Sequence, residues 1–301
     1  MTNNNVLKGV FFVALGATSY GMLATYVKLA YKENFTTAEI TTSQFVLGIL
    51  GILIINLFNK IKNKNKEATE TTTKRNIFQL MLAGSSLGMT SVFYYLCVKY
   101  IDVSIAIVLL MQTVWMGVLI EIILDKKWPS VQKRVSVLLV LLGTILATNL
   151  INNQTELDWR GIFWGLMAAM SFTTTMFTAN RIATHVSSAQ RSLYMLLGGA
   201  VIVFGFGIFT QTTSFNFEIF AKWGIILSLF GTIIPPMLFN IGFPKTGIGL
   251  GSIVASLELP VSVLMAYYIL NDKVIFLQWI GIILILFAII IMNINFKPKK
   301  S

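Results

Sequence analysis

Apolar stretches of roughly 20 residues recur along the whole sequence, and short polar segments that hold most of the charged residues separate them. An apolar helix of that length crosses the hydrocarbon core of a bilayer while its backbone hydrogen bonds are satisfied internally. The stretches lack the alternation of apolar and polar residues that is typical of membrane β-barrel strands. The pattern therefore predicts an all-α integral membrane protein with ten transmembrane helices. The predicted helices are Val6–Tyr31, Thr36–Phe58, Lys74–Val98, Asp102–Leu124, Val131–Leu150, Trp159–Thr184, Ser187–Thr210, Ala221–Phe243, Gly247–Leu270 and Val274–Phe296.

The composition agrees with a chain that is surrounded by lipid. Of its 301 residues, 55% are hydrophobic and only 12% are charged, which is too few charges for the surface of a soluble domain of this size. The longest polar segment, residues 59–75, is rich in Lys, Asn and Thr and is predicted to be a solvated connector. No polar segment is long enough to form a separate soluble domain.

The positions of the basic residues predict the orientation of the chain in the membrane. With a cytoplasmic N-terminus, 17 of the 23 Lys and Arg residues, Arg191 among them, lie on the cytoplasmic side, as the positive-inside rule requires. We therefore expect both termini in the cytoplasm and the prokaryotic plasma membrane as the location. The basic residues are not gathered on one face with interleaved aromatic residues, so the net charge of +11 does not indicate nucleic-acid binding. The residues assigned to the outer side are Lys28, Lys32, Lys99, Arg160, Lys222 and Lys273.

The two halves of the sequence repeat each other. A shift of 146 positions aligns polar residues at the same places relative to the helix ends, and a shift of 152 aligns "KGVF" from Lys8 with "RGIF" from Arg160. We therefore predict two five-helix units, residues 1–150 and 151–301. Because five is odd, the second unit enters the membrane from the opposite side, and such inverted repeats are typical of alternating-access carriers. The polar pairs at the shift of 146 are Lys99 and Lys245, Lys127 and Lys273, Gln132 and Gln278, and Asn149 and Asn295.

Two motifs extend this interpretation. "SYGMLATYVKLA" from Ser19 contains an aromatic residue and Gly followed by Lys, and "SLELPVSVLMAYYILNDK" from Ser256 contains an acidic residue and then Pro-Val. In these motifs and in its architecture the chain resembles the EamA-type carriers of the drug/metabolite transporter superfamily. The resemblance implies transport of small metabolites, such as amino acids or related compounds, and favours export. The chain departs from the family in the turn that reads "LNDK" at Asn271 and "LDKK" at Asp125, where the family's acidic residue is displaced.

Glu258 is the most informative polar residue within the predicted helices. An acidic side chain near the centre of a membrane helix costs about 3 kcal/mol even on the lenient insertion scale, so an interaction or a function has to offset it. The shift of 146 places Glu258 on Gln112, at the midpoint of the fourth helix. We predict that Glu258 and Gln112 face a central cavity and bind substrate or protons. The alternative is a protonated carboxyl that forms a hydrogen bond between helices.

The prolines of the eighth and ninth helices mark further candidate cavity positions. A proline lacks a backbone N–H donor, and this applies to Pro235, Pro236 and Pro260. The carbonyl groups that consequently have no partner in the helix are available to a buried cavity. The alternative is a tolerated packing kink. Asn240 lies one turn after Pro236, and the shift of 146 pairs it with Tyr94 in the third helix. We predict that both line the cavity.

Other residues have a packing interpretation beside a functional one. Tyr20 and Trp115 are candidate aromatic walls of the cavity, although a lone aromatic residue in a membrane helix is more often a packing residue. Two pairs with small-xxx-small spacing are expected to allow close helix contact. These pairs are Gly84 with Gly88 and Gly247 with Gly251.

Three classes of function are compatible with a membrane protein of this composition. A membrane-embedded enzyme would need a nucleophile with a base or a set of metal ligands, but His185 and Cys97 are the only His and Cys and lie far apart in sequence. No phosphate-binding Gly-rich motif is present. We therefore predict a non-enzymatic secondary transporter without a cofactor or metal, acting as a monomer on a small-molecule substrate, with protons as the candidate coupling ion. A passive scramblase or a receptor is the remaining alternative.

Overall fold

The computed structural model describes residues 3–62, 72–101, 103–148, 158–271 and 273–293, and this part of the chain contains helices and no strands. This confirms the all-α prediction. The elements are α1 (Asn3–Lys32), α2 (Thr37–Lys62), α3 (Lys74–Tyr100), α4 (Val103–Leu110), α5 (Thr113–Asp125), α6 (Val131–Ala147), α7 (Trp159–Arg181), α8 (Ser188–Thr210), η1 (Phe220–Gly224), α9 (Ile225–Ser228), η2 (Leu229–Ile233), α10 (Ile234–Thr246), α11 (Ile248–Ala255), α12 (Glu258–Leu270) and α13 (Phe276–Asn293).

Eight helical segments of the described chain are long and apolar enough to cross a membrane. Two of them are interrupted: the fourth predicted helix is α4 with α5, and the ninth is α11 with α12. The eighth runs without a break from η1 to α10 and changes between π-helical and α-helical turns. The fifth and tenth predicted helices correspond to α6 and α13, which are shorter than the other eight, so the count of ten spans stays a prediction. The predicted ends at Asp102, Leu150 and Phe296, and the repeat pair Asn149 and Asn295, lie outside the described residues.

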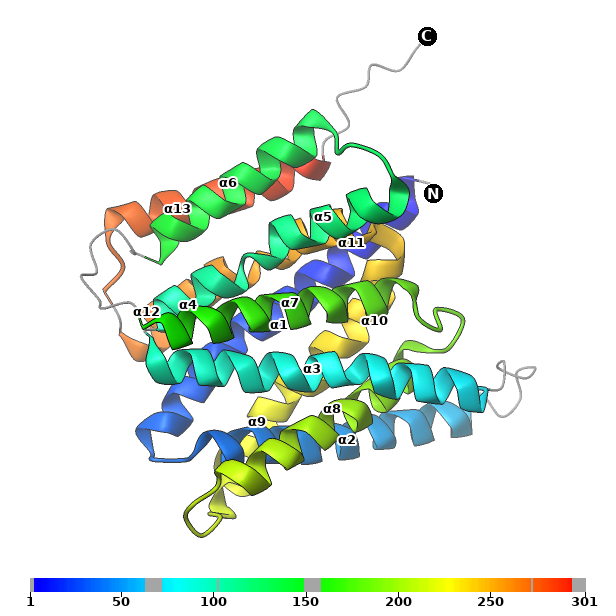
Figure 1. Cartoon of the computed structure of the whole chain (residues 1–301), viewed down its shortest axis with the longest axis vertical. Coiled ribbons are helices and arrows are strands. Elements are labelled where there is room, and N and C mark those ends of the chain that lie inside the picture. The colour runs from blue at the N-terminus through cyan, green and yellow to red at the C-terminus, as the bar shows by residue number, and fades with distance from the viewer. Residues whose placement is uncertain (1–2, 63–71, 102, 149–157, 272, 294–301) are drawn as a thin grey trace.

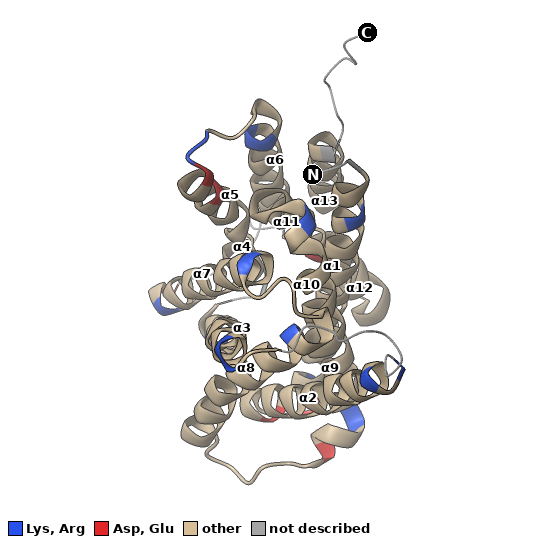
Figure 2. Cartoon of the chain, turned by 90° about the vertical axis from the view of Figure 1, so that its right-hand side faces the viewer, with Lys and Arg blue, Asp and Glu red and all other residues tan. Residues whose placement is uncertain are grey.

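The helices lie side by side, and the start of α1 and the end of α13 are found at the same edge of the molecule (Figure 1). Figure 2 views the bundle from this edge, approximately along the helices, and shows Lys and Arg at several helix ends and in the connection between α5 and α6. Large apolar side chains such as Phe78 and Phe209 are exposed on the outer surface, as expected for contact with lipid.

Contacts between the two halves occur in matched pairs. In the first pair, α3 packs against α8 and α2 packs against η2. In the second pair, α3 packs against α7 and α1 packs against α10. When each helix is replaced by its counterpart in the other half, one contact of a pair turns into the other contact of that pair. The element α6 packs directly against its counterpart α13, and α5, the second part of the fourth helix, packs against α11, the first part of the ninth helix. A twofold relation between the halves would give this pattern of contacts.

Glycines set the closest helix contacts. A β-carbon on Gly84 would overlap the backbone of Met195, and one on Gly88 would overlap the carbonyl of Gly199, so these residues bring α3 and α8 together as predicted. Gly251 packs against Phe243. The prediction for Gly247 was wrong: its φ of 77° places it in the turn between α10 and α11, where a residue without a β-carbon is favoured.

Arg191, which the sequence assigned to the cytoplasmic side, is buried, with only 1% of its surface exposed. Its guanidinium donates hydrogen bonds to the carbonyls of Ile182 (3.1 Å) and Ala179 (2.6 Å) at the end of α7, and to the carbonyl of Asn240 (2.7 Å) in α10. The negative end of the α7 dipole favours a cation at this position. The Asn240 carbonyl has no donor within its own helix, because the residue four positions later is Pro244. Arg191 therefore joins α7, α8 and α10.

Candidate functional site

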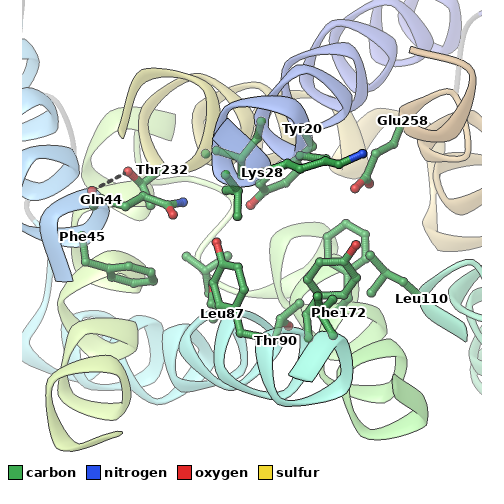
Figure 3. Close-up of a pocket in the computed structure, with 18 of the residues that line it drawn as sticks. Tyr20, Lys28, Gln44, Phe45, Leu87, Thr90, Leu110, Phe172, Thr232 and Glu258 are labelled. Atoms are coloured by element: carbon green, nitrogen blue, oxygen red, sulfur yellow. Dashed lines mark hydrogen bonds between the residues drawn. The ribbon is translucent and has the colours of Figure 1, made fainter. Parts of the chain in front are cut away.

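A cavity of about 1020 Å³, a volume that includes its open part, lies between the two halves of the chain (Figure 3). Its walls come from α1, α2, α3 and α4 of the first half and from α7, η2 and α12 of the second. Three of the sequence-predicted residues, Tyr20, Tyr94 and Glu258, line it. Among the lining residues, which all belong to the described chain, Glu258 is the only carboxylate and Lys28 the only basic residue. The wall is otherwise apolar, aromatic or uncharged polar.

The cavity reaches the surface at one edge of the molecule and is closed toward the other. Lys28, near the end of α1, is exposed and lines the cavity on the open side. Toward the edge where α1 starts, α1 and α10 are in close contact. A β-carbon added to Gly9 or to Gly16 of α1 would lie 2.7 Å from a side-chain atom of α10. The cavity therefore opens at the edge opposite to the start of α1.

Three aromatic rings form the closed end of the cavity. Tyr20 packs against Phe172 with ring centroids 6.0 Å apart and against Phe239 with centroids 5.6 Å apart. The rings of Phe172 and Phe239 are 6.4 Å apart. Tyr20 and Phe172 line the main cavity, whereas Phe239 and Tyr20 line a second, smaller cavity, so this cluster lies between the two.

Glu258 is the first residue of α12, directly after the interruption of the ninth helix at Ser256 and Leu257. Gly21 of α1 allows close contact here, because a β-carbon on it would lie 2.5 Å from the Glu258 carbonyl oxygen. Within the described chain the Glu258 carboxyl group makes no hydrogen bond or ion pair, and Figure 3 shows it directed into the cavity. The structure thus offers no described partner for the interhelical hydrogen bond that was the alternative interpretation.

Pro260 is the third residue of α12, and this position explains how the helix accommodates it. Backbone N–H groups of the first helical turn have no acceptor within the helix, so proline costs little there. The helix is interrupted before Pro260 rather than bent around it, and the Ser256 carbonyl accepts from the Leu259 N–H at 3.2 Å instead. The interruption leaves Glu258 at the start of a helix that faces the cavity.

Gln112 and Trp115 do not line the cavity. Gln112 lies at the interruption between α4 and α5, which is the counterpart of the interruption before Glu258. Its amide donates to the Val108 carbonyl at 3.0 Å and accepts from the Trp115 indole at 2.8 Å. Trp115 is 38% exposed. The two residues that the repeat pairs, Gln112 and Glu258, thus share a position in the fold, but only Glu258 lines the cavity.

The eighth helix contains two π-helical segments, η1 and η2, and the second forms part of the cavity wall. Pro235 and Pro236 lie in the first turn of α10, separated by one residue from the end of η2, and cannot donate to the carbonyls of the preceding turn. The Phe230 carbonyl, whose π-helical donor would be residue 235, accepts instead from the Ser19 hydroxyl at 3.0 Å. The prolines therefore stabilise a widened turn beside the cavity, a feature often found at functional sites.

Asn240 lies beside a second, smaller cavity of about 300 Å³, which Pro236 and Tyr20 also line. Its amide nitrogen donates to the Ser192 hydroxyl at 2.9 Å, and its buried side-chain oxygen has no partner within the described chain. Tyr94 lines only the main cavity, so the structure does not bring Asn240 and Tyr94 to one site.

Sequence reasoning did not identify Gln44 and Thr232, which line the main cavity opposite Glu258 (Figure 3). Gln44 follows several Thr and Ser residues near the start of the second predicted helix, where polar residues are expected at a membrane boundary. The neighbouring prolines were the only signal that could have drawn attention to residues 231 and 232.

No group of three or more His, Cys, Asp or Glu side chains that could hold a metal ion occurs in the described chain. Cys97 is buried, and His185 bonds to Asn76 at 2.9 Å away from the cavity. Neither residue belongs to the main cavity.

The sequence model of the EamA-like transporter family matches residues 7–149 and 159–294. A solved structure titled "Crystal structure of protein" has the same fold, with a TM-score of 0.75 over 96% of this chain and 97% of that chain, at 14% sequence identity. No curated protein matches the sequence. Because the family match spans nearly the whole chain and the described helices are long and apolar, this chain belongs to the EamA-like transporter family and is a multi-pass membrane transporter of the drug/metabolite type.

Proposed function

We propose that this protein is a secondary transporter that moves a small organic metabolite, such as an amino acid or a related compound, by alternating access. The observation that carries the proposal is the main cavity, which both halves of the chain line and which opens at one edge only. A carrier needs a binding site that each face of the membrane can reach in turn, and a site between two repeats satisfies this requirement.

The paired contacts between the halves support an inverted repeat of residues 1–150 and 151–301. In such a repeat, exchanging the conformations of the two units closes the open edge and opens the closed one. The tight contact between α1 and α10 at Gly9 and Gly16 is then the one that separates in the opposite state. With cytoplasmic termini in the prokaryotic plasma membrane, the described state is open to the outside, and export ends in this state.

Glu258 is the proposed coupling residue. Its carboxyl group is the only one in the cavity wall, belongs to the second half and lies next to an interruption of its helix. Burial disfavours a charged carboxylate, so either a proton or a cationic group of the substrate can neutralise it. Proton release on one side and uptake on the other would couple transport to the proton gradient. We place the activity in a monomer, because one chain supplies the whole cavity.

The test is solute flux into proteoliposomes that contain the purified full-length chain. Counterflow of a mixture of radiolabelled amino acids should exceed that of empty vesicles, and Glu258→Gln should abolish it at matched protein levels. Glu218→Gln is the control, because Glu218 is exposed outside the cavity and should leave flux unchanged. Equal flux and equal pH dependence in Glu258→Gln and wild type would refute the coupling role. Lipid scrambling without solute flux would support the scramblase alternative instead.

A further inference from the structure

Gln44 is a buried polar residue whose side-chain amide is not engaged. It lies in α2, is 3% exposed and lines the main cavity. Its side-chain oxygen is buried without a hydrogen-bond partner, and its amide nitrogen donates no hydrogen bond within the described chain. Buried polar groups in folded proteins are nearly always hydrogen-bonded, so an open amide beside a cavity indicates a ligand contact. Because no bond fixes the amide, rotation can direct its oxygen into the cavity.

Gly231 contributes a second acceptor beside Gln44. Its carbonyl would pair with residue 235 in an α-helix or residue 236 in a π-helix, and both are proline. A β-carbon on Gly231 would overlap the Gln44 side-chain nitrogen, so this glycine allows the amide to lie directly against η2. The Gly231 carbonyl thus lacks the donor that its own helix would normally supply.

Thr232 and Thr90 also line the cavity, and their hydroxyl groups already donate hydrogen bonds within the chain. Thr232 donates to the Gln44 backbone carbonyl and to the Ser228 carbonyl, each at 3.0 Å, and Thr90 donates to the Ser86 carbonyl at 2.7 Å. A hydroxyl has one hydrogen and these bonds use it, so neither threonine offers a donor to a ligand. Figure 3 shows Gln44, Thr232 and Phe45 together at the end of the cavity away from Glu258.

We propose that Gln44 and Gly231, termed here the Gln44 subsite, bind a primary ammonium group of the transported solute. An ammonium group has three donors and no acceptor, and therefore suits a wall that offers acceptors. The ring of Phe45, which also lines the cavity, is suited to an adjacent cation. A ligand carboxylate would face oxygen lone pairs here and is disfavoured. This inference rests on the proposed transport function and specifies its substrate class: an amine on an apolar or aromatic body.

The test uses three probes with the same aromatic body: 2-phenylethylamine, its N-trimethyl derivative and 2-phenylethanol. Binding to the purified full-length chain is measured by calorimetry. The wild type should bind the primary amine at least about 10-fold more tightly than the trimethyl cation, which keeps the charge but has no N–H donor. Gln44→Met keeps the side-chain length and removes the amide, so it should weaken amine binding on the order of 10-fold and leave the trimethyl cation unaffected.

Two further variants make the result decisive. Gly231→Ala should also weaken amine binding, because the added methyl group displaces the Gln44 amide; it tests the subsite even if Gln44→Met folds poorly. Gln190→Met, at the start of α8 and outside both cavities, is the matched control and should bind like the wild type. Equal affinity for all three probes, or no binding of the amine to the wild type, would overturn the proposal.

The subsite and the transport function can fail separately. If Glu258→Gln abolishes amine binding while Gln44→Met and Gly231→Ala do not change it, the ammonium group binds at Glu258 and the Gln44 subsite is wrong, although transport can stand. If the amine binds in a Gln44-dependent way but no solute crosses the proteoliposome membrane, the subsite stands and the transport function fails.

Discussion

Replacing Arg191 with methionine removes a buried cation while keeping much of the side-chain volume. Three hydrogen bonds of 2.6 to 3.1 Å to backbone carbonyls are lost. A buried carbonyl left without a donor costs about 1–3 kcal/mol, which gives about 3–9 kcal/mol for three. Removing the guanidinium also relieves its desolvation penalty, which amounts to several kcal/mol. The Asn240 carbonyl cannot recover a helical donor because Pro244 occupies the required position. We expect a net destabilisation of about 3 kcal/mol, near the low end of this range.

The assay is equilibrium unfolding of the purified chain in mixed detergent micelles. Arg181→Met is the matched control: Arg181 is 53% exposed, and its ion pair with Asp125 spans 3.5 Å. Exposed pairs of this kind contribute less than about 1 kcal/mol. Arg191→Lys should lie between wild type and Arg191→Met, because an ammonium group cannot span the same set of carbonyls as a planar guanidinium. If Arg191→Met and Arg181→Met lose the same free energy of unfolding, Arg191 does not hold α7, α8 and α10 together.

Two further predictions follow from helix packing and topology. Gly84→Ala should destabilise the chain by about 1–3 kcal/mol through overpacking against α8. Gly205→Ala is the control and should not destabilise the chain, because Gly205 has open space around it. Equal unfolding curves for the two variants would contradict the close contact at Gly84. A cysteine at Thr213 should react with an impermeant thiol reagent in intact cells and one at Lys62 should not, with low background because Cys97 is buried; labelling of Lys62→Cys from outside would reverse the orientation.

The sequence alone was sufficient to predict the all-helical membrane architecture, the repeat and the family. These properties depend on local hydropathy and on spacing along the chain, and the hydrophobic pattern reports both directly. The prediction that Glu258 faces a cavity rested on the cost of a carboxylate in lipid, and the cavity contains it. Tyr20 and Tyr94 also line this cavity, as the sequence predicted.

Only the tertiary structure decided which face of each helix points inward. In a membrane helix the lipid-facing and cavity-facing sides are both largely apolar, so periodicity does not fix its rotation. For this reason Gln112, the repeat partner of Glu258, lies outside the cavity, while Gln44 lines it. The sequence assigned Arg191 to the cytoplasmic side because it lies near a helix end. A side chain at that position can point to water or to the end of α7, and the sequence does not distinguish the two. Burial and the carbonyls that compensate for it are properties of packing between distant segments, which the order of residues does not express.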